Sequence, residues 1–222
     1  MTGMPTSIFI TLFVLLTQDN FVPDSSFEEY RIDFCGLTPS IEKFKRDNTY
    51  WRSPTYGNPN IYSKTVEPHC WNHIRADSPD QPRTGNRMLM ICTYGSKDFR
   101  SYAQVKLKEP LQKQRRYILR FWLKVPSDAD AFSPNIGILL STDARIYDTT
   151  SNIQERPTVE FSDWNPGGWV MIEGKFWADE AFGYLTIGNF RSNSDSKLVM
   201  LVNESDDRVS WLFIDDVELY CE

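Results

Sequence analysis

The sequence has few of the residues and motifs on which common enzymes depend. Its 222 residues include two histidines, His69 and His73. It contains no Gly-x-Ser-x-Gly elbow, no phosphate-binding loop and no Cys-x-x-Cys pair. These absences exclude the usual serine-hydrolase, P-loop and zinc-ribbon patterns. A sustained helical period is also missing, which argues against a helical fold.

Basic residues are outnumbered by acidic ones. The chain carries 24 Lys and Arg against 30 Asp and Glu, a formal net charge of −6. Proteins that bind nucleic acid need a positive patch for the phosphates, so we expect no nucleic-acid partner. With 24% charged residues and a mean hydropathy of −0.45, the sequence also excludes a polytopic membrane protein.

The one long apolar run lies near the N-terminus. Residues 8–16 are apolar apart from Thr11, which is too short to cross a bilayer but has the length of a signal-peptide core. We therefore predict a signal peptide over residues 1–18, no membrane span in the mature chain, and a secreted or cell-surface location. A buried strand and a misassigned start are the alternatives, because no Lys or Arg precedes the run.

The four cysteines fit export. An even number of cysteines in an exported chain is typical of disulfides. Cys35 and Cys70 both lie in irregular, proline-rich sequence, so we predict that they pair. Cys92 and Cys221 then either pair with each other or both stay free.

Short segments of alternating or continuous apolar residues follow one another after residue 87. We expect residues 31–83, with their prolines and aromatics, to form functional loops, and residues 21–30 to form a short strand. The rest predicts an all-β fold, a β-sandwich or jelly roll, in one domain over residues 19–222. The expected strands are residues 87–94, 101–107, 116–125, 135–142, 158–161, 169–177, 184–190 and 210–221.

Two acidic clusters lie at the two ends of this domain. In residues 210–221 the apolar positions change parity at Asp215 and Asp216, so either both faces are buried there or a bulge resets the register. The second cluster contains Glu28 and Glu29. We predict that the first and last strands meet and that these carboxylates hold a calcium ion; two solvated acidic turns are the alternative.

Aromatic side chains alternate with charges in two of the expected strands. Sugar rings stack on aromatic faces while planar polar groups bind their hydroxyls, so this pattern predicts a carbohydrate site. Loop tryptophans offer a second location. Packing under loops or between sheets is the alternative for each tryptophan. The predicted ligand-binding residues are Trp122, Arg120, Trp169, Trp177 and Glu173 on the strands, and Trp51 and Trp71 in the loops.

Several motifs carry a family resemblance. Residues 22–29 (VPDSSFEE) resemble the opening of exported Bacteroidetes domains found with OmpA-like domains or in gliding-motility proteins, and residues 135–137, 168–169, 186–190 and 214–217 match later patterns in order. The first and last motifs are similar to those of carbohydrate-binding modules with a galactose-binding-domain-like jelly roll. That resemblance implies a structural Ca²⁺ ligated by Glu28 and Asp216, with backbone oxygens near Thr84 and Gly85.

Together these features predict an exported, non-catalytic module that binds a glycan or polysaccharide. Two other functions stay open. One is an adhesion or envelope-assembly module whose partner is a cell-envelope protein. The other is a polysaccharide-active hydrolase that uses Glu173 or Asp216, although glycosidases need a second carboxylate at a defined separation.

Overall fold

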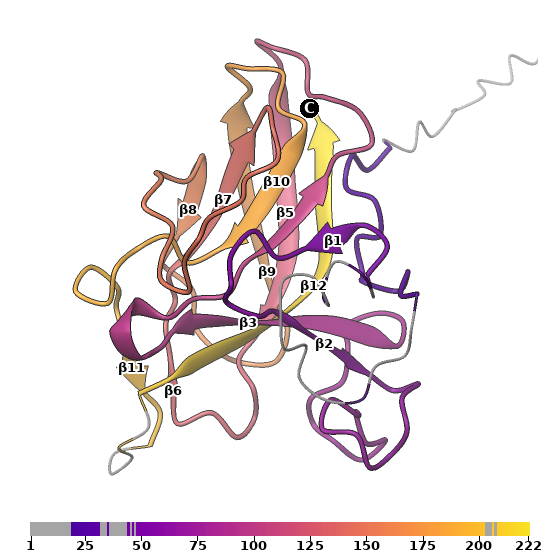
Figure 1. Ribbon diagram of the computed structural model, residues 1–222, viewed down its shortest axis with the longest axis vertical. Coiled ribbons are helices and arrows are strands. Elements are labelled where there is room, and N and C mark those ends of the chain that lie inside the picture. The colour runs from indigo at the N-terminus through magenta and orange to yellow at the C-terminus, as the bar shows by residue number, and fades with distance from the viewer. Residues whose placement is uncertain are drawn as a thin grey trace, which may run out of the picture.

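The computed structural model describes residues 19–31, 35, 44, 46, 48–202, 206 and 208–222. Regular structure in these residues is almost entirely β-strand, in two five-stranded antiparallel sheets that pack against each other (Figure 1). The predicted all-β sandwich is therefore confirmed. The predicted signal peptide over residues 1–18 lies outside the described residues.

The first sheet forms one layer of the sandwich. Across it, the order is β1 (Trp51–Arg52), β4 (Ala103–Lys106), β10 (Tyr184–Gly188), β7 (Ile136–Ser141) and β8 (Val159–Phe161).

The second sheet has β12, the last strand, at its centre (yellow in Figure 1). Across it, the order is β2 (Asn60–Ser63), β3 (Arg87–Tyr94), β12 (Ser210–Cys221), β5 (Arg116–Lys124) and β9 (Val170–Trp177). A separate pair joins β6 (Ala131–Phe132) to β11 (Val199–Met200), and a 3-10 turn, η1, spans Ser96–Asp98.

Alternation along the strands builds the core between the two sheets. Leu119 and Phe121 of β5 are fully buried and belong to the same apolar cluster as Leu185 and Ile187 of β10. Their neighbours in sequence point outward, because successive side chains of a strand face opposite sides. The outer faces are therefore where a binding site can form.

The eight strands expected from residue 87 onward are all present, with ends that differ by at most two residues. The sequence pattern missed β1, β2, β6 and β11, which are two to four residues long. Runs this short show no readable alternation, and tertiary pairing creates them.

The first described segment, residues 19–31, lies beside the last strand, as predicted. The N–H of Phe21 donates to the carbonyl of Leu219 at 2.9 Å, and that of Val217 donates to Ser25 at 2.8 Å. Residues 21–30 do not form the expected strand, however. Asp24 has a φ of 48° and starts a turn that a strand cannot contain.

The acidic pair in β12 produces the predicted bulge. The pairing of β12 with β5 shifts register between Asp215 and Glu218, and Asp216 has a φ of 48°. The strand is also buried on both faces around the pair, so the two alternatives occur together.

The predicted disulfide between Cys35 and Cys70 is present, with a Cα–Cα distance of 4.8 Å. Cys92 and Cys221 form no disulfide. Nowhere in the described ranges is there a helix with the length and apolar content that crossing a bilayer requires.

Candidate functional site

The outer face of β5 and β9 carries most of the predicted ligand-binding residues, and it is a ladder of ion pairs. Arg120 and Glu173 are cross-strand partners, with Arg120 Nε 2.6 Å from Glu173 Oε2. Lys175 and Arg116 both bind Glu222, at 2.6 and 2.8 Å. These charges already satisfy one another, which leaves few free polar groups to bind a sugar.

The tryptophans of this face do not form one surface. The Arg83 guanidinium lies 3.8 Å from the centre of the Trp122 ring and covers it. Trp169 is half-buried and donates its indole N–H to the carbonyl of Gln81 at 3.0 Å. Trp177 is 66% exposed, but it lies six residues along β9 from the partner of Trp122, roughly 20 Å away.

Trp51 is not a surface residue. It is 1% exposed, its indole N–H donates to the carbonyl of Asp24 at 2.9 Å, and its ring packs 4.9 Å from that of Phe27. The Trp51 ring therefore belongs to the core, which argues against stacking on a sugar, and ligand contact by Trp51 stays a prediction.

Trp71, in contrast, stands over a cleft of about 310 Å³ on the outer face of the second sheet. The Trp71 side chain is 55% exposed, and its ring centre lies 5.4 Å from that of Tyr62. Tyr62 packs edge-on against Phe213 at 5.3 Å. We call this site the aromatic cleft; its lining residues are Tyr62, Trp71, His73, Ile74, Ser78, Asp80, Pro126, Asp128 and Phe213.

Polar groups rim the aromatic cleft. Asp128 is exposed, while Asp80 binds Lys124 Nζ at 3.0 Å and accepts bonds from Ser127. Burial raises the pKa of the Tyr62 hydroxyl, and the negative charges of Asp128 and Asp80 add to the shift. The tyrosine thus stays a neutral donor and acceptor beside two carboxylates, a combination that suits sugar hydroxyls.

The loop that carries Trp71 is held against β2. The Ser63 N–H donates to the Asn72 carbonyl at 3.0 Å, and the Ile74 N–H donates to the Ser63 carbonyl at 2.9 Å. The disulfide of Cys70 adjoins Trp71 directly. The exposed ring therefore sits on a fixed backbone, which lowers the entropy lost when a ligand binds.

Sequence reasoning found Trp71 but missed the rest of the aromatic cleft. Tyr62 belongs to a four-residue strand inside a region read as loops. The sequence does contain a signal for Phe213: it lies between the core residues Leu212 and Ile214 on a strand, so its side chain must face outward. Asp80 and Asp128 reach the cleft from separate loops, and no spacing in the sequence signals their proximity.

The predicted calcium ligands Glu28 and Asp216 lie on either side of residues 83–87. Asp216 accepts hydrogen bonds from Arg83 Nη1 at 2.5 Å and Thr84 Oγ1 at 2.6 Å. Glu28 Oε1 accepts the N–H groups of Asn86 and Arg87, at 2.8 and 2.9 Å.

This arrangement does not fit calcium. Arg83 and Thr84 already bond the two carboxylate oxygens of Asp216, and a positive guanidinium beside the site repels a divalent cation. Calcium binding stays a sequence prediction that a chelator test can decide. Elsewhere in the described residues, the cluster of Cys35, His69 and Cys70 offers no metal site, because its sulfurs form the disulfide.

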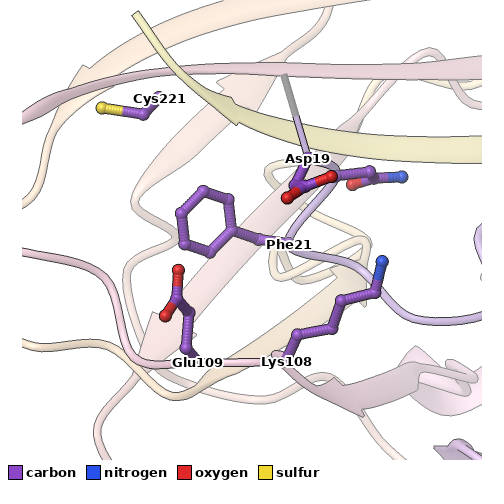
Figure 2. Close-up of a pocket in the computed structure, with 6 residues that line it drawn as sticks. Asp19, Phe21, Lys108, Glu109 and Cys221 are labelled. Carbon is purple, nitrogen blue, oxygen red and sulfur yellow. The ribbon is translucent and has the colours of Figure 1, made fainter. Parts of the chain in front are cut away.

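A second cavity, of about 540 Å³, lies between residues 19–21 and the end of β12 (Figure 2). Figure 2 shows the Phe21 ring among the side chains of Lys108, Glu109 and Cys221. That ring packs edge-on against Tyr117 at 5.6 Å. Among its described lining residues Phe21 is the one aromatic, so the cavity resembles a sugar site less than the aromatic cleft does.

The sequence matches no protein-family profile and no curated protein. Among solved structures, it is similar to the CBM22-1 xylan-binding domain of Xyn10C from Paenibacillus barcinonensis, with 15% identity over 92% of this chain and 95% of that one, and a TM-score of 0.42. It is also similar to the K1 cleaved adhesin domain of Lys-gingipain from Porphyromonas gingivalis W83, with 12% identity over 92% and 97%, and a TM-score of 0.40. At these values neither likeness bears on the ligand of this chain.

Proposed function

We propose that this protein is an exported, non-catalytic carbohydrate-binding module whose ligand site is the aromatic cleft. One observation supports the proposal above the others: the Trp71 ring is 55% exposed and fixed beside Tyr62 and the rim carboxylates. More than half of the Trp71 side chain is left open to solvent, and its flat apolar face matches the C–H face of a sugar ring.

The contacts of the carboxylates support a non-catalytic role. Glu173 is paired with Arg120, Asp216 with Arg83, and Asp80 with Lys124. A hydrolase needs one carboxyl group kept protonated and another free to act, whereas each of these three is held by a cation.

Export is supported by the disulfide between Cys35 and Cys70, since such bonds persist in oxidising compartments. We therefore place the module outside the cell or on its surface.

Affinity electrophoresis of the full chain in gels that contain neutral xylan, mannan, β-glucan or galactan tests the proposal. Removing the ring in Trp71→Ala should weaken binding about tenfold or more, because aromatic anchors dominate interface energies. Trp177→Ala removes another exposed tryptophan, which lies outside the cleft, and should leave binding unchanged. Absence of binding to every glycan, or equal loss in both variants, would refute the assignment.

Adhesion to a protein is the second candidate, and one observation favours it. Trp177 and Met171 are exposed by 66% and 48% on β9, an edge strand of the second sheet. If this function is correct, Trp177→Ala abolishes capture of a cell-envelope protein, while Trp71→Ala leaves that capture intact.

A further inference from the structure

A second cleft lies on the outer face of the first sheet, the opposite layer from the aromatic cleft. It has a volume of about 270 Å³. We call it the basic cleft; its lining residues are Arg31, Asn48, Thr49, Tyr50, Trp51, Arg52, Lys106 and Tyr184. Three of these side chains are cationic and none is acidic, in a protein whose net charge is −6.

Strand register brings the central charges together. Arg52 of β1 pairs with Gln104 of β4, and Lys106 lies two residues further along the same face of β4. Such diagonal neighbours are about 7–8 Å apart, a gap that one anionic group can bridge. Tyr184 of β10 is the direct cross-strand partner of Lys106, and the Arg52 guanidinium lies over its ring.

Arg52 is held in place without being neutralised. Its Nε and Nη2 atoms donate to Gln104 Oε1, at 3.1 and 2.7 Å, and its guanidinium lies 5.1 Å from the centre of the Tyr184 ring. Gln104 is fully buried and is itself fixed by a bond to Thr186. The planar fork of the guanidinium is therefore oriented by a neutral amide and keeps its full charge.

None of Arg31, Arg52 and Lys106 forms an ion pair with a carboxylate among the residues that the structure describes. Several other surface cations do form such pairs: Lys113, Arg120 and Arg191 each bind a glutamate. Within the part of the chain that the structure describes, three cations thus surround one hollow with no carboxylate bound to them, an arrangement that suits an anion.

The aromatic rings in the basic cleft indicate which class of ligand bears the anionic group. Tyr50 is 45% exposed, so its ring offers a flat apolar face next to the charges. An acidic peptide would bind more naturally by adding a strand to a sheet edge, but the edge strand here, β1, has only two residues. A short hollow with an aromatic face and cations suits a charged sugar ring better.

We propose that the basic cleft binds an anionic sugar residue of an acidic polysaccharide, with its carboxylate or sulfate between Arg52 and Lys106 and its ring against Tyr50. This goes beyond the glycan binding assigned to the aromatic cleft and does not depend on it, because the two clefts share no residue.

Titration calorimetry of the full chain with polygalacturonate and with dextran sulfate tests the proposal. Lys106→Gln and Arg52→Gln should each weaken binding about tenfold, because each removes a charge-assisted hydrogen bond. Lys106 is exposed, so its variant keeps the fold. Lys64→Gln is the matched control: it removes one exposed positive charge that lines neither cleft, and it should bind as the wild type does.

The outcomes separate the alternatives. Binding of polygalacturonate identifies a carboxylate as the anion, and binding of dextran sulfate alone identifies a sulfate; both support the proposal. Failure to bind either polymer overturns it, as does equal weakening by Lys64→Gln. Binding of poly-glutamate that depends on Arg52 and Lys106 as strongly overturns it in favour of an acidic peptide. Trp71→Ala leaves this binding unchanged, so failure of the aromatic cleft is distinguishable from failure here.

Discussion

The two clefts of this protein share aromatic side chains and differ in charge. The aromatic cleft places Tyr62 and Trp71 beside Asp80 and Asp128, whereas the basic cleft is flanked by cations such as Lys106. Rings alone give affinity for sugars in general, while the charge beside them decides which sugars are accepted. A net charge of −6 for the whole chain hides this difference, because charge acts locally over about a Debye length of 10 Å.

The largest effect is expected from removing the disulfide, which supports the aromatic cleft and not the basic cleft. The disulfide of Cys35 and Cys70 closes a 35-residue separation next to Trp71, so Cys35→Ser with Cys70→Ser should cost about 3–4 kcal/mol of unfolding free energy. Binding of neutral glycan should fall because the Trp71 loop loosens, and polygalacturonate binding should persist. Urea unfolding and calorimetry measure both.

The control for this pair is Cys221→Ser, which removes a thiol that forms no disulfide. We expect its stability to change by about 0.5 kcal/mol or less. Equal loss of binding at both clefts in the double variant would show that the loop does not belong to the aromatic cleft alone.

A similar loss is expected from the buried carboxylate in β12. Asp215 accepts the N–H groups of Arg83, Thr84 and Asp216, at 2.8, 3.2 and 2.8 Å. Asp215→Ala leaves these donors unpaired and should lower the unfolding free energy by about 3 kcal/mol. Asp179→Ala, at an exposed position, is the control. An equal loss of unfolding free energy in this variant would mean that the hydrogen bonds of Asp215 do not stabilise the fold.

The loss of Asp215 should also distinguish the clefts. Residues 78 and 80, which line the aromatic cleft, lie just before the anchored Arg83, and no residue of this segment lines the basic cleft. We therefore expect neutral-glycan affinity to fall more than polygalacturonate affinity. The same two titrations, run where Asp215→Ala is still folded, compare them.

Salt should affect ligand binding at the two clefts differently, although the change is smaller than those above. Raising the salt concentration from about 50 to about 300 mM screens charges at the surface, so polygalacturonate binding should weaken severalfold. Binding of a neutral glycan at the aromatic cleft should stay within about twofold, since stacking on Trp71 carries no charge. Parallel calorimetric titrations at both concentrations measure the difference, and equal salt sensitivity would contradict the assignment of charge to one cleft.

The smallest effect concerns calcium. With Arg83 bonded to Asp216, we expect a chelator to shift the melting temperature by less than about 1 °C, because roughly 1 kcal/mol of binding free energy would move it by 2–4 °C in a domain this size. Scanning calorimetry with EDTA, and with added Ca²⁺ as the comparison, decides this. A larger shift would restore the calcium site that the sequence predicts at Glu28 and Asp216.

The aromatic residues show why sequence placed the site only in part. Trp122, Trp169 and Trp177 alternate with charges and look alike as a pattern. In the structure one is covered by Arg83, one bonds Gln81, and one stands alone at a strand end. Residues from loops far away in the chain determine the environment of each tryptophan, and the periodicity of a strand contains no information on those loops.

Local chemistry was enough to predict the eight main strands, the irregularity at Asp215 and Asp216, and the pairing of Cys35 with Cys70. Alternation and residue type depend on near neighbours in the chain, so they can be read from the sequence alone. Tertiary structure alone decided that Trp51 is core and Trp71 is surface, and that two clefts of opposite charge exist. Each cleft joins loops and strands that meet only after both sheets have formed, and burial of a side chain is a property of that assembly.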